Sequence, residues 1–251
     1  MKIISTIKDI LKPLKPQICV VCGGLIMGGC YKDKWGQLFH AHHQVNLCAS
    51  CGRVVAKDDT HLPYNRYVCS HCVRAVVRTS EHVKWVYDRV QMIFKSRGLE
   101  LPANVPVEIK DAAEIAKLRG DNVIDVNNLG LTQSGGVGLF GVKLNHKVYM
   151  LDHLHKVIFG GTLAHELLHV WQNEHHIKLP SFYCEGFCNL GTYLLYRSIE
   201  NEMTAVLVDN MMNDDDPIYG DGFRAVKAIY EGEGQKNLKK TLELLGMMNK
   251  K

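Results

Sequence analysis

The sequence predicts an α+β fold in which a small β-rich, metal-binding module precedes a mainly helical domain with a small sheet. Seven of the nine cysteines fall between Cys19 and Cys72, mostly in C-x2-C pairs. Further along, apolar residues recur at helical spacing, and one such stretch, residues 160–171, contains His-Glu-x-x-His. We therefore expect a leader at residues 1–16, the metal-binding module at 17–78 and the helical domain at 79–251.

Composition and charge fit a globular protein and argue against two classes of partner. The chain has 251 residues, of which 46% are hydrophobic, enough for a large core. Its net charge of +4 is mild and its Lys and Arg residues are scattered, so we expect no nucleic-acid partner. No apolar run approaches the length of a membrane span, so we expect no membrane contact.

The first segment, residues 1–16 (MKIISTIKDILKPLKP), has lysines throughout and no long apolar centre, which is not typical of a signal peptide. Either a partly ordered leader or a short amphipathic helix ended by Pro13 fits this segment. In a chain without a secretion signal, paired cysteines indicate metal binding rather than disulfides. We therefore expect a cytoplasmic protein.

The cysteine block predicts two structural zinc sites, because each C-x2-C knuckle supplies two ligands from one tight turn. The second site is a complete set of four cysteines, whose two pairs are separated by seventeen residues: Cys48, Cys51, Cys69 and Cys72. The first site begins with Cys19 and Cys22, and His40 and His43 complete it by repeating the same spacing. His42 and Cys30 are alternative ligands. Gly23, Gly24 and Gly52 follow two of the knuckles, where such turns often need a positive φ.

This block resembles a LIM domain, a double zinc finger of about this size. The family's first site reads C-x2-C and then H-x2-(C or H), and its second site consists of two cysteine pairs. The sequence departs from this pattern in one place, because four residues separate His43 from Cys48 where the family usually has two. LIM domains bind proteins far more often than they catalyse reactions, so the resemblance implies a docking or scaffolding role.

The connecting segment contains two predicted helices and two predicted strands. The first helix ends at Gly98 and buries Val83, Val86, Tyr87, Val90 and Phe94. A short strand follows around residues 105–107, and a capping box at residues 111–114 starts a helix that ends near Gly120. Residues 130–141 are Gly-rich and predict a flexible turn or cleft-edge loop. Residues 141–151 then alternate loosely, as a strand does.

The stretch at residues 160–171 predicts a helix: Gly160 and Gly161 punctuate the chain, and Thr162 is a fair N-cap. His165 and His169 are four residues apart, so both rings lie on one face and can bind one zinc ion. Glu166 beside them can take a proton from bound water. The strand at residues 141–151 precedes this helix, and in zinc peptidases of this build such a strand forms the cleft edge to which an extended substrate adds. A surface helix with two chance histidines, after an ordinary sheet strand, is the alternative.

A third metal ligand should follow, and Glu185 is the candidate. Residues 180–181 (Pro-Ser) start a second predicted helix, which would aim Glu185 at the metal when packed against the first. Two His plus Glu is a known catalytic zinc set that leaves one position for water. Cys184 and Cys188 are interpreted as small packing residues.

The last part of the chain contains an acidic turn at residues 214–216 and a closing amphipathic helix at residues 236–245. Between them, Asp221 is a candidate helix N-cap in a structural interpretation. In the functional alternative, Tyr219 or Arg224 reaches the cleft and supports an oxyanion, and Tyr219 is our choice.

From Cys19 onward the chain resembles the LIM-domain zinc peptidases best known from plants, where they limit organ growth and are coupled to ubiquitin. The resemblance rests on the cysteine block and on residues 161–171 (GTLAHELLHVW), 185–188 (EGFC) and 219–224 (YGDGFR). It implies a compact, prokaryotic version of the family with a gluzincin-like zincin domain. The plant proteins carry ubiquitin-interacting helices ahead of the finger. Eighteen residues precede Cys19, so we do not expect ubiquitin coupling here.

The resemblance also implies a function: limited cleavage of protein substrates by a zinc-dependent endopeptidase, with the LIM-like module as a docking or regulatory element. One catalytic zinc would be held by His165, His169 and Glu185, with Glu166 as the catalytic base, beside two structural zinc ions. The alternative is a LIM adaptor whose peptidase domain is latent or inactive.

Overall fold

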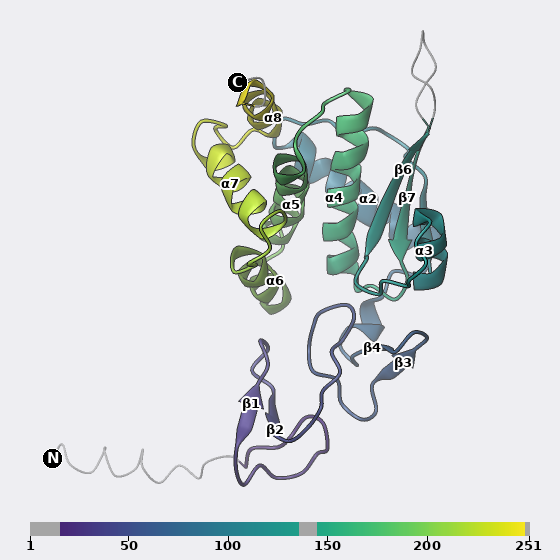
Figure 1. The fold of residues 1–251 in the computed structure, drawn as a ribbon, viewed down its shortest axis with the longest axis vertical. Coiled ribbons are helices and arrows are strands. Elements are labelled where there is room, and N and C mark those ends of the chain that lie inside the picture. The colour runs from purple at the N-terminus through teal and green to yellow at the C-terminus, as the bar shows by residue number, and fades with distance from the viewer. Residues whose placement is uncertain (1–15, 136–144, 249–251) are drawn as a thin grey trace, which may run out of the picture.

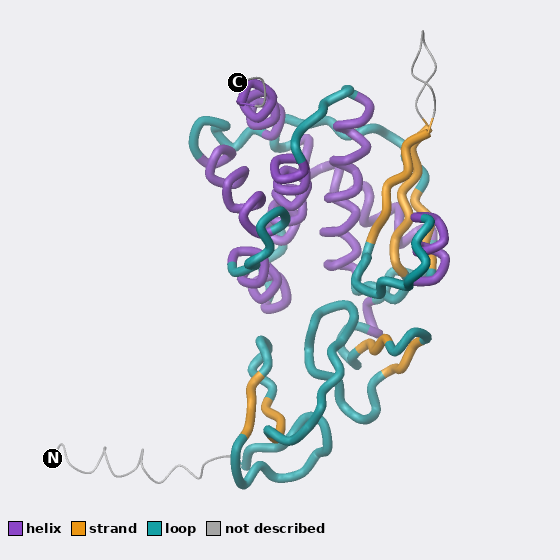
Figure 2. The backbone as a smooth tube through the Cα atoms, in the orientation of Figure 1, coloured by secondary structure: helices purple, strands orange, loops and turns teal. Residues whose placement is uncertain are grey.

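The structure is a computed structural model that describes residues 16–135 and 145–248. Two short hairpins occupy one end of the molecule, and the helices and a three-stranded sheet occupy the other (Figures 1 and 2). This mixed α+β architecture agrees with the predicted fold class. Among the described residues, no helix combines the length and apolar character that crossing a bilayer requires. Residues 1–15 of the predicted leader lie outside the described residues.

The two hairpins are antiparallel pairs, and each borders one of the predicted metal-ligand sets. Strand β1 (Cys30–Lys32) pairs with β2 (Leu38–His40), and β3 (Thr60–Leu62) pairs with β4 (Arg66–Val68). A 3-10 turn, η1 (Val73–Ala75), ends this part of the chain. Gly23 and Gly52 have φ values of +72° and +73°, which confirms the positive φ predicted after these two knuckles.

The sheet has the order β5-β7-β6, with β7 (Asn145–Leu151) in the centre. Strand β5 (Val107–Lys110) runs parallel to β7, and β6 (Gly130–Gly135) runs antiparallel to it. Helix α3 (Ala112–Arg119) follows β5, and its predicted capping box is present because Asp111 and Glu114 bond each other's backbone N–H.

The position of β6 corrects two predictions. Residues 130–135 of the Gly-rich segment form a strand, not a flexible loop, because their backbone pairs in full with β7. The strand predicted to be the cleft edge is the central strand of the sheet, so neighbours already occupy both of its edges. The edge strands are β5 and β6, and β6 is the one that contacts α4. Residues 136–144 lie outside the described part of the chain.

Helix α4 lies between α2, α5 and the sheet, and α6 and α7 pack on α5 (Figure 1). Their bounds are α2 Ser80–Lys95, α4 Lys156–Glu174, α5 Ser181–Arg197, α6 Glu202–Met212, α7 Gly220–Glu231 and α8 Leu238–Met248. One hydrophobic core runs through the helices and the sheet, whereas a second, smaller one surrounds the four cysteines of the second predicted site. Helix α6 was not predicted from the sequence.

Helix α4 begins six residues before the predicted N-cap. His155 is the N-cap, and its ring Nδ1 accepts a hydrogen bond from the backbone N–H of Val157. The two glycines that suggested a break, Gly160 and Gly161, lie inside the helix. A Cβ at Gly160 would stand 2.8 Å from Leu195, and one at Gly161 would stand 2.5 Å from the Tyr196 hydroxyl. The glycines therefore mark a close approach of α5, not a helix end.

The start of α7 differs from prediction as well, because Asp221 is not its N-cap. The cap position is Tyr219, which makes no side-chain cap bond. The backbone oxygen of Asp216, in the exposed acidic turn, accepts from the N–H groups of Gly220 and Asp221. The Asp221 carboxylate instead pairs with Arg224.

Candidate metal centre and cleft

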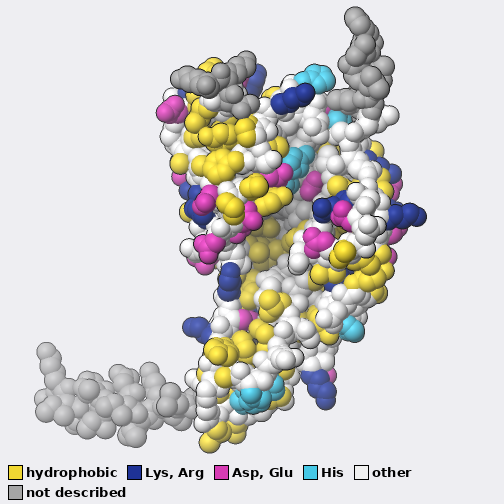
Figure 3. Space-filling model, in the orientation of Figure 1, with side chains coloured by type: hydrophobic (Ala, Val, Ile, Leu, Met, Phe, Trp, Pro, Cys, Tyr) yellow, Lys and Arg dark blue, Asp and Glu magenta, His cyan; other side chains and the backbone are white. Residues whose placement is uncertain are grey.

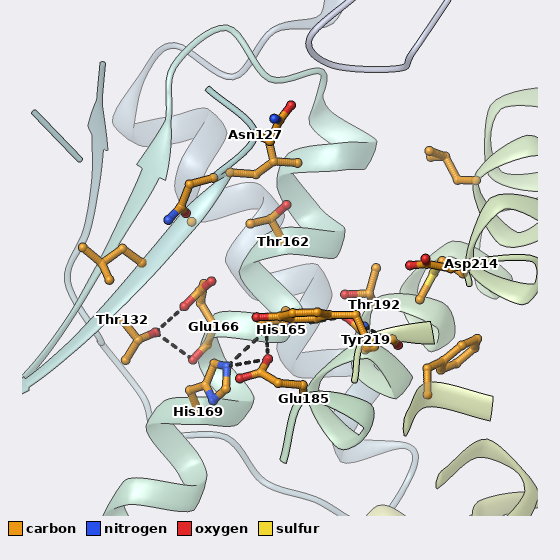
Figure 4. Close-up of a pocket in the computed structure, with 18 of the residues that line it drawn as sticks. Asn127, Thr132, Thr162, His165, Glu166, His169, Glu185, Thr192, Asp214 and Tyr219 are labelled. Carbon is orange, nitrogen blue, oxygen red and sulfur yellow. Dashed lines mark hydrogen bonds and ion pairs between the residues drawn. The ribbon is translucent and has the colours of Figure 1, made fainter. Parts of the chain in front are cut away.

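Three side chains from two adjacent helices converge at one point (Figure 4). His165 and His169 lie one turn apart on α4, and their Nε2 atoms are 3.1 Å apart. Glu185 comes from the first half of α5, and its Oε2 lies 3.2 Å from Nε2 of His165 and 3.5 Å from Nε2 of His169. The helix spacing and the close packing of α4 on α5 thus bring together the three residues that the sequence singled out.

The distances and the electrostatics of this cluster fit a zinc ion. With zinc–ligand bonds of about 2.0–2.1 Å, two ligands of a tetrahedron lie about 3.3 Å apart, close to the three distances found. Burial lowers the pKa of His169, but contacts with Cys184 and Glu185 and the charge of Glu166 outweigh it and raise the pKa to about 10. Burial raises the pKa of Glu185, yet the two histidines outweigh it and lower the pKa to about 2. Glu185 and Glu166 thus stabilise a positive charge at His169, and the histidines stabilise the Glu185 carboxylate.

Two cysteines of α5 lie on the other side of the His169 ring. Cys188 is fully buried with its Sγ 3.5 Å from Nδ1 of His169, and Cys184 Sγ lies 3.8 Å from the same nitrogen. Both thiols are close enough to enter alternative ligand sets with His169. We favour Glu185 because it faces both Nε2 atoms at once, whereas the thiols face Nδ1. Cys184 and Cys188 thus contact a candidate ligand in addition to filling space.

Asn189 orients His165, the other histidine of the cluster. It was not identified as a site residue from the sequence. Its side-chain oxygen lies 3.0 Å from Nδ1 of His165, and its amide nitrogen donates to the backbone oxygen of Tyr219 at 3.0 Å. A metal-binding histidine usually donates its other ring N–H to such a partner, which fixes the ring. One signal was present, because Asn189 follows Glu185 by four residues and so shares its helix face.

Glu166 points from α4 toward strand β6, where a threonine holds it (Figure 4). The hydroxyl of Thr132 donates to Oε2 of Glu166 at 2.7 Å and also lies 3.1 Å from its backbone oxygen. A Cβ at Gly130 would stand 2.8 Å from Oε1 of Glu166. Glu166 is 7% exposed, so β6 fixes this carboxylate beside the cluster. No signal in the sequence pointed to Thr132.

The cluster opens into a cavity of about 970 Å³. The space-filling view shows this hollow between the helices and the sheet, with histidine and acidic side chains inside (Figure 3). One wall includes residues 129–132 of the β6 region, and α5, α6 and α7 supply the other. Tyr219 lines the cavity, and burial together with the charge of Glu185 raises its pKa, so its hydroxyl stays protonated as a donor.

Arg224, the rival of Tyr219, does not line the cavity. Its guanidinium donates to the backbone oxygens of Met212 and Asp214 at 3.1 and 2.6 Å and pairs with Asp221. These contacts connect the acidic turn to α7. Arg224 therefore stabilises the fold at this turn and does not reach the cavity.

The structure also assembles both ligand sets of the cysteine block. The four sulfurs of the second set, from Cys48, Cys51, Cys69 and Cys72, lie within 4.8 Å of one another, and all four residues are buried. The Cys51 and Cys69 sulfurs are 3.7 Å apart. Zinc–sulfur bonds of about 2.3 Å place two sulfurs of a tetrahedron about 3.8 Å apart, so the cluster has the dimensions of a zinc site.

The first set brings together the four preferred candidates, Cys19, Cys22, His40 and His43. Nδ1 of His40 lies 3.5 Å from the Cys22 sulfur and 3.3 Å from Nε2 of His43. Nε2 of His40 lies 3.1 Å from the backbone oxygen of Leu25, so it can donate there and leave Nδ1 free for a metal. The rival candidates His42 and Cys30 are outside this four-atom group.

Comparisons with known proteins find distant relatives. The chain is 20% identical to Protein DA1 of Arabidopsis thaliana over 83% of its length and 50% of that protein. It is 18% identical to LIM domain-containing protein HDR3 of Oryza sativa subsp. japonica, over 84% of the chain and 56% of that protein. Protein DA1-related 7 of Arabidopsis thaliana is 20% identical over 90% of the chain and 52% of that protein. The chain thus spans about half the length of these curated relatives. No family model matches it, and no solved structure matches significantly.

Proposed function

We propose that this protein is a zinc-dependent endopeptidase that cleaves protein substrates at few sites. The observation that carries the proposal is the convergence of two histidine Nε2 atoms and a Glu185 oxygen within 3.5 Å, beside the buried carboxylate of Glu166. The distant similarity to DA1 and its relatives supports this choice, since the alignments extend over most of the chain.

In this proposal, His165, His169 and Glu185 hold the zinc ion. When bound, zinc supplies a Lewis acid that polarises the scissile carbonyl and makes a water molecule more acidic. Glu166 accepts the proton of the attacking water and later passes it to the leaving amine. The Thr132 hydroxyl keeps one Glu166 oxygen occupied, so the other oxygen is the proton acceptor.

Two further elements of the cleft would act on the substrate. The free edge of β6 lies along the cavity, and an extended peptide can pair with it through main-chain hydrogen bonds. Tyr219, protonated and on the cavity wall, can donate a hydrogen bond to the oxyanion that forms during attack. Residues 17–78 would dock or select the protein that is cut.

A Glu166→Gln variant tests the catalytic role of this carboxylate. Glutamine keeps the size and the Thr132 contact but cannot take the proton, so hydrolysis of labelled casein should fall by at least about 100-fold. Zinc content, measured by mass spectrometry, should stay at the wild-type value. Glu174→Gln, on the same helix but away from the cavity, serves as the control and should retain activity. Unchanged cleavage by Glu166→Gln would refute the mechanism.

Metal counting tests the ligand assignment. We expect three zinc ions per chain in the wild type, and two in a Glu185→Ala variant because one ligand of the catalytic ion is missing. Cys184→Ser and Cys188→Ser should keep three, since we assign these thiols to the outer face of His169. Loss of zinc in a cysteine variant, with full zinc content in Glu185→Ala, would assign the site to sulfur instead.

A LIM-like adaptor with a latent peptidase is the second candidate. Three apolar side chains near the first ligand set are largely exposed, namely Leu25 at 56%, Met27 at 90% and Tyr31 at 60%. Such side chains suit a protein-contact surface. If full-length protein with all three zinc ions cleaves no peptide of a proteome-derived library, the adaptor is favoured over the peptidase.

A further inference from the structure

The second cysteine cluster is tied to the turn that leads into α4. This turn, residues 152–155, connects β7 to the helix that carries His165 and His169. Arg66, three residues before Cys69, donates to a carboxylate oxygen of Asp152 at 2.5 Å and to its backbone oxygen at 2.8 Å. Arg66 is only 3% exposed, so a buried guanidinium connects the strand before Cys69 to the turn before α4.

A second contact comes from inside a metal-binding knuckle. Ser50 stands between Cys48 and Cys51, and its hydroxyl oxygen accepts a hydrogen bond from the backbone N–H of His155 at 2.8 Å. His155 is the N-cap of α4 and also accepts from Val157 in the first turn. The knuckle that carries Cys48 and Cys51 is therefore hydrogen-bonded to the start of α4 through one residue, Ser50.

Two more contacts connect the second cysteine cluster to the helical part of the molecule. The N–H of Val77, five residues after Cys72, donates to the backbone oxygen of Leu154 at 3.1 Å. On the opposite side of the cleft, Met203 at the start of α6 packs against the cysteine cluster. Figure 1 shows β3, β4 and the segment after them below the lower ends of α4 and the sheet. The cluster thus contacts the turn before α4 and the start of α6, a helix that lines the cavity.

We propose that the second cysteine cluster, with zinc bound, positions the cleft: it fixes the N-terminal ends of α4 and α6, and thereby the placement of the histidines relative to Glu185. The knuckle around Ser50 belongs to no strand and is held by isolated bridges and turn hydrogen bonds, to which a bound metal adds the two cysteine ligands on either side of Ser50. His155 and His165 are separated by about 15 Å of continuous helix, which transmits a displacement of its end as a rigid body. This inference rests on the proposed zinc site of His165, His169 and Glu185.

The test uses full-length protein with Ser50→Ala and Arg66→Met combined, which leaves all proposed zinc ligands in place. Zinc is retained in the cysteine clusters, and Co²⁺ is titrated into the remaining site. Cobalt with nitrogen and oxygen ligands absorbs in the visible range without the near-ultraviolet thiolate band that marks a cysteine site. We expect the double variant to bind Co²⁺ about tenfold more weakly and with a shifted visible spectrum. Lys84→Met, which removes an exposed cation from α2, is the matched control and should match the wild type.

The outcomes separate this inference from the proposed function. If the double variant takes up Co²⁺ with wild-type affinity and spectrum, the inference is wrong and the proposed zinc site stands. If the wild type takes no Co²⁺ into a site without thiolate bands, the proposed site fails and the inference fails with it. If the double variant does not fold, the single variant Ser50→Ala is compared with Ser50→Thr, which keeps a hydroxyl at this position. A weaker, spectrally shifted site in Ser50→Ala that Ser50→Thr rescues supports positioning, and equal behaviour of the two overturns it.

Discussion

The two halves of the cysteine block have similar ligand geometry but different surroundings. The second cluster consists of four buried cysteines and contacts the turn before α4 and the start of α6. The first cluster pairs buried Cys19 with exposed Cys22 and two partly exposed histidines. Within the described part of the chain, the hydrogen bonds of residues 16–43 remain within residues 16–54. One cluster is therefore built into the body of the molecule, and the other projects from it.

This difference teaches that a double finger need not act as one unit. Sequence spacing predicts two metal sites of similar size, and only the packing separates a cluster buried against the helical body from one that lies at the surface. The exposed apolar side chains lie beside the first cluster, where a partner could reach them. The contrast between the clusters can be tested by matched substitutions in each.

The largest difference should come from removing one ligand of each cluster. Cys69→Ser leaves three buried sulfurs without a full metal site, so we expect the free energy of unfolding to fall by about 4 kcal/mol. Cys22→Ser should cost its cluster a zinc ion as well, but should leave the main unfolding transition of the helices in place. Zinc analysis and urea unfolding followed by tryptophan fluorescence measure both effects. Equal loss of global stability in the two variants would contradict the comparison.

The buried ion pair should give the next largest effect. Arg66→Met removes a buried guanidinium from Asp152, which keeps only His153 Nδ1 at 2.9 Å, and breaking a buried pair costs about 3 kcal/mol. The Arg66 side chain is 2% exposed, whereas the Lys84 side chain, in the surface pair with Asp88, is 75% exposed. Lys84→Met should therefore change the free energy of unfolding by less than about 0.5 kcal/mol. Urea unfolding of both variants makes the measurement, and similar values would show that the Arg66 contact does not stabilise the body of the molecule.

The smallest effect tests the two knuckle glycines, which are locally equivalent. Gly23 and Gly52 have φ values of +72° and +73°, and a Cβ at either would meet no atom within 4 Å. Alanine should therefore cost about 1 kcal/mol locally at each position. We expect Gly52→Ala to shift the main thermal transition, and Gly23→Ala to weaken zinc retention without shifting it. Calorimetry and chelator competition measure the two responses, and a shift of the main transition by Gly23→Ala would count against the separation.

Local sequence signals predicted those parts of the fold that depend on local chemistry. The capping box of α3, the start of α5 at Ser181 and the helix α2 all follow the predicted pattern. The predicted start of α4 was wrong because Gly160 and Gly161 lie inside the helix, where they make room for Leu195 and Tyr196 of α5. Strand β6 was missed for a related reason, since its Gly-rich sequence becomes a strand only by pairing with β7.

The candidate site divides in the same way. Spacing on one helix placed His165, Glu166 and His169 together, and a helix start signal led to Glu185. Thr132 could not be found, because it reaches Glu166 across 34 positions of sequence through a strand that was not predicted. The contacts of Ser50 and Arg66 with the turn before α4 span even longer separations, so only the folded chain reveals them.

Under the proposed function, the free edge of β6 would limit which features of a substrate sequence the cleft can discriminate. A peptide paired with this edge is extended, and its side chains point alternately to opposite faces of the enlarged sheet. Alternate positions of the peptide would then face the cavity beside Thr132 and Glu166, while the intervening positions face away from it. The cleavage preference of such an enzyme repeats every second residue, and folded segments, whose backbone groups are already paired, are excluded before their sequence matters.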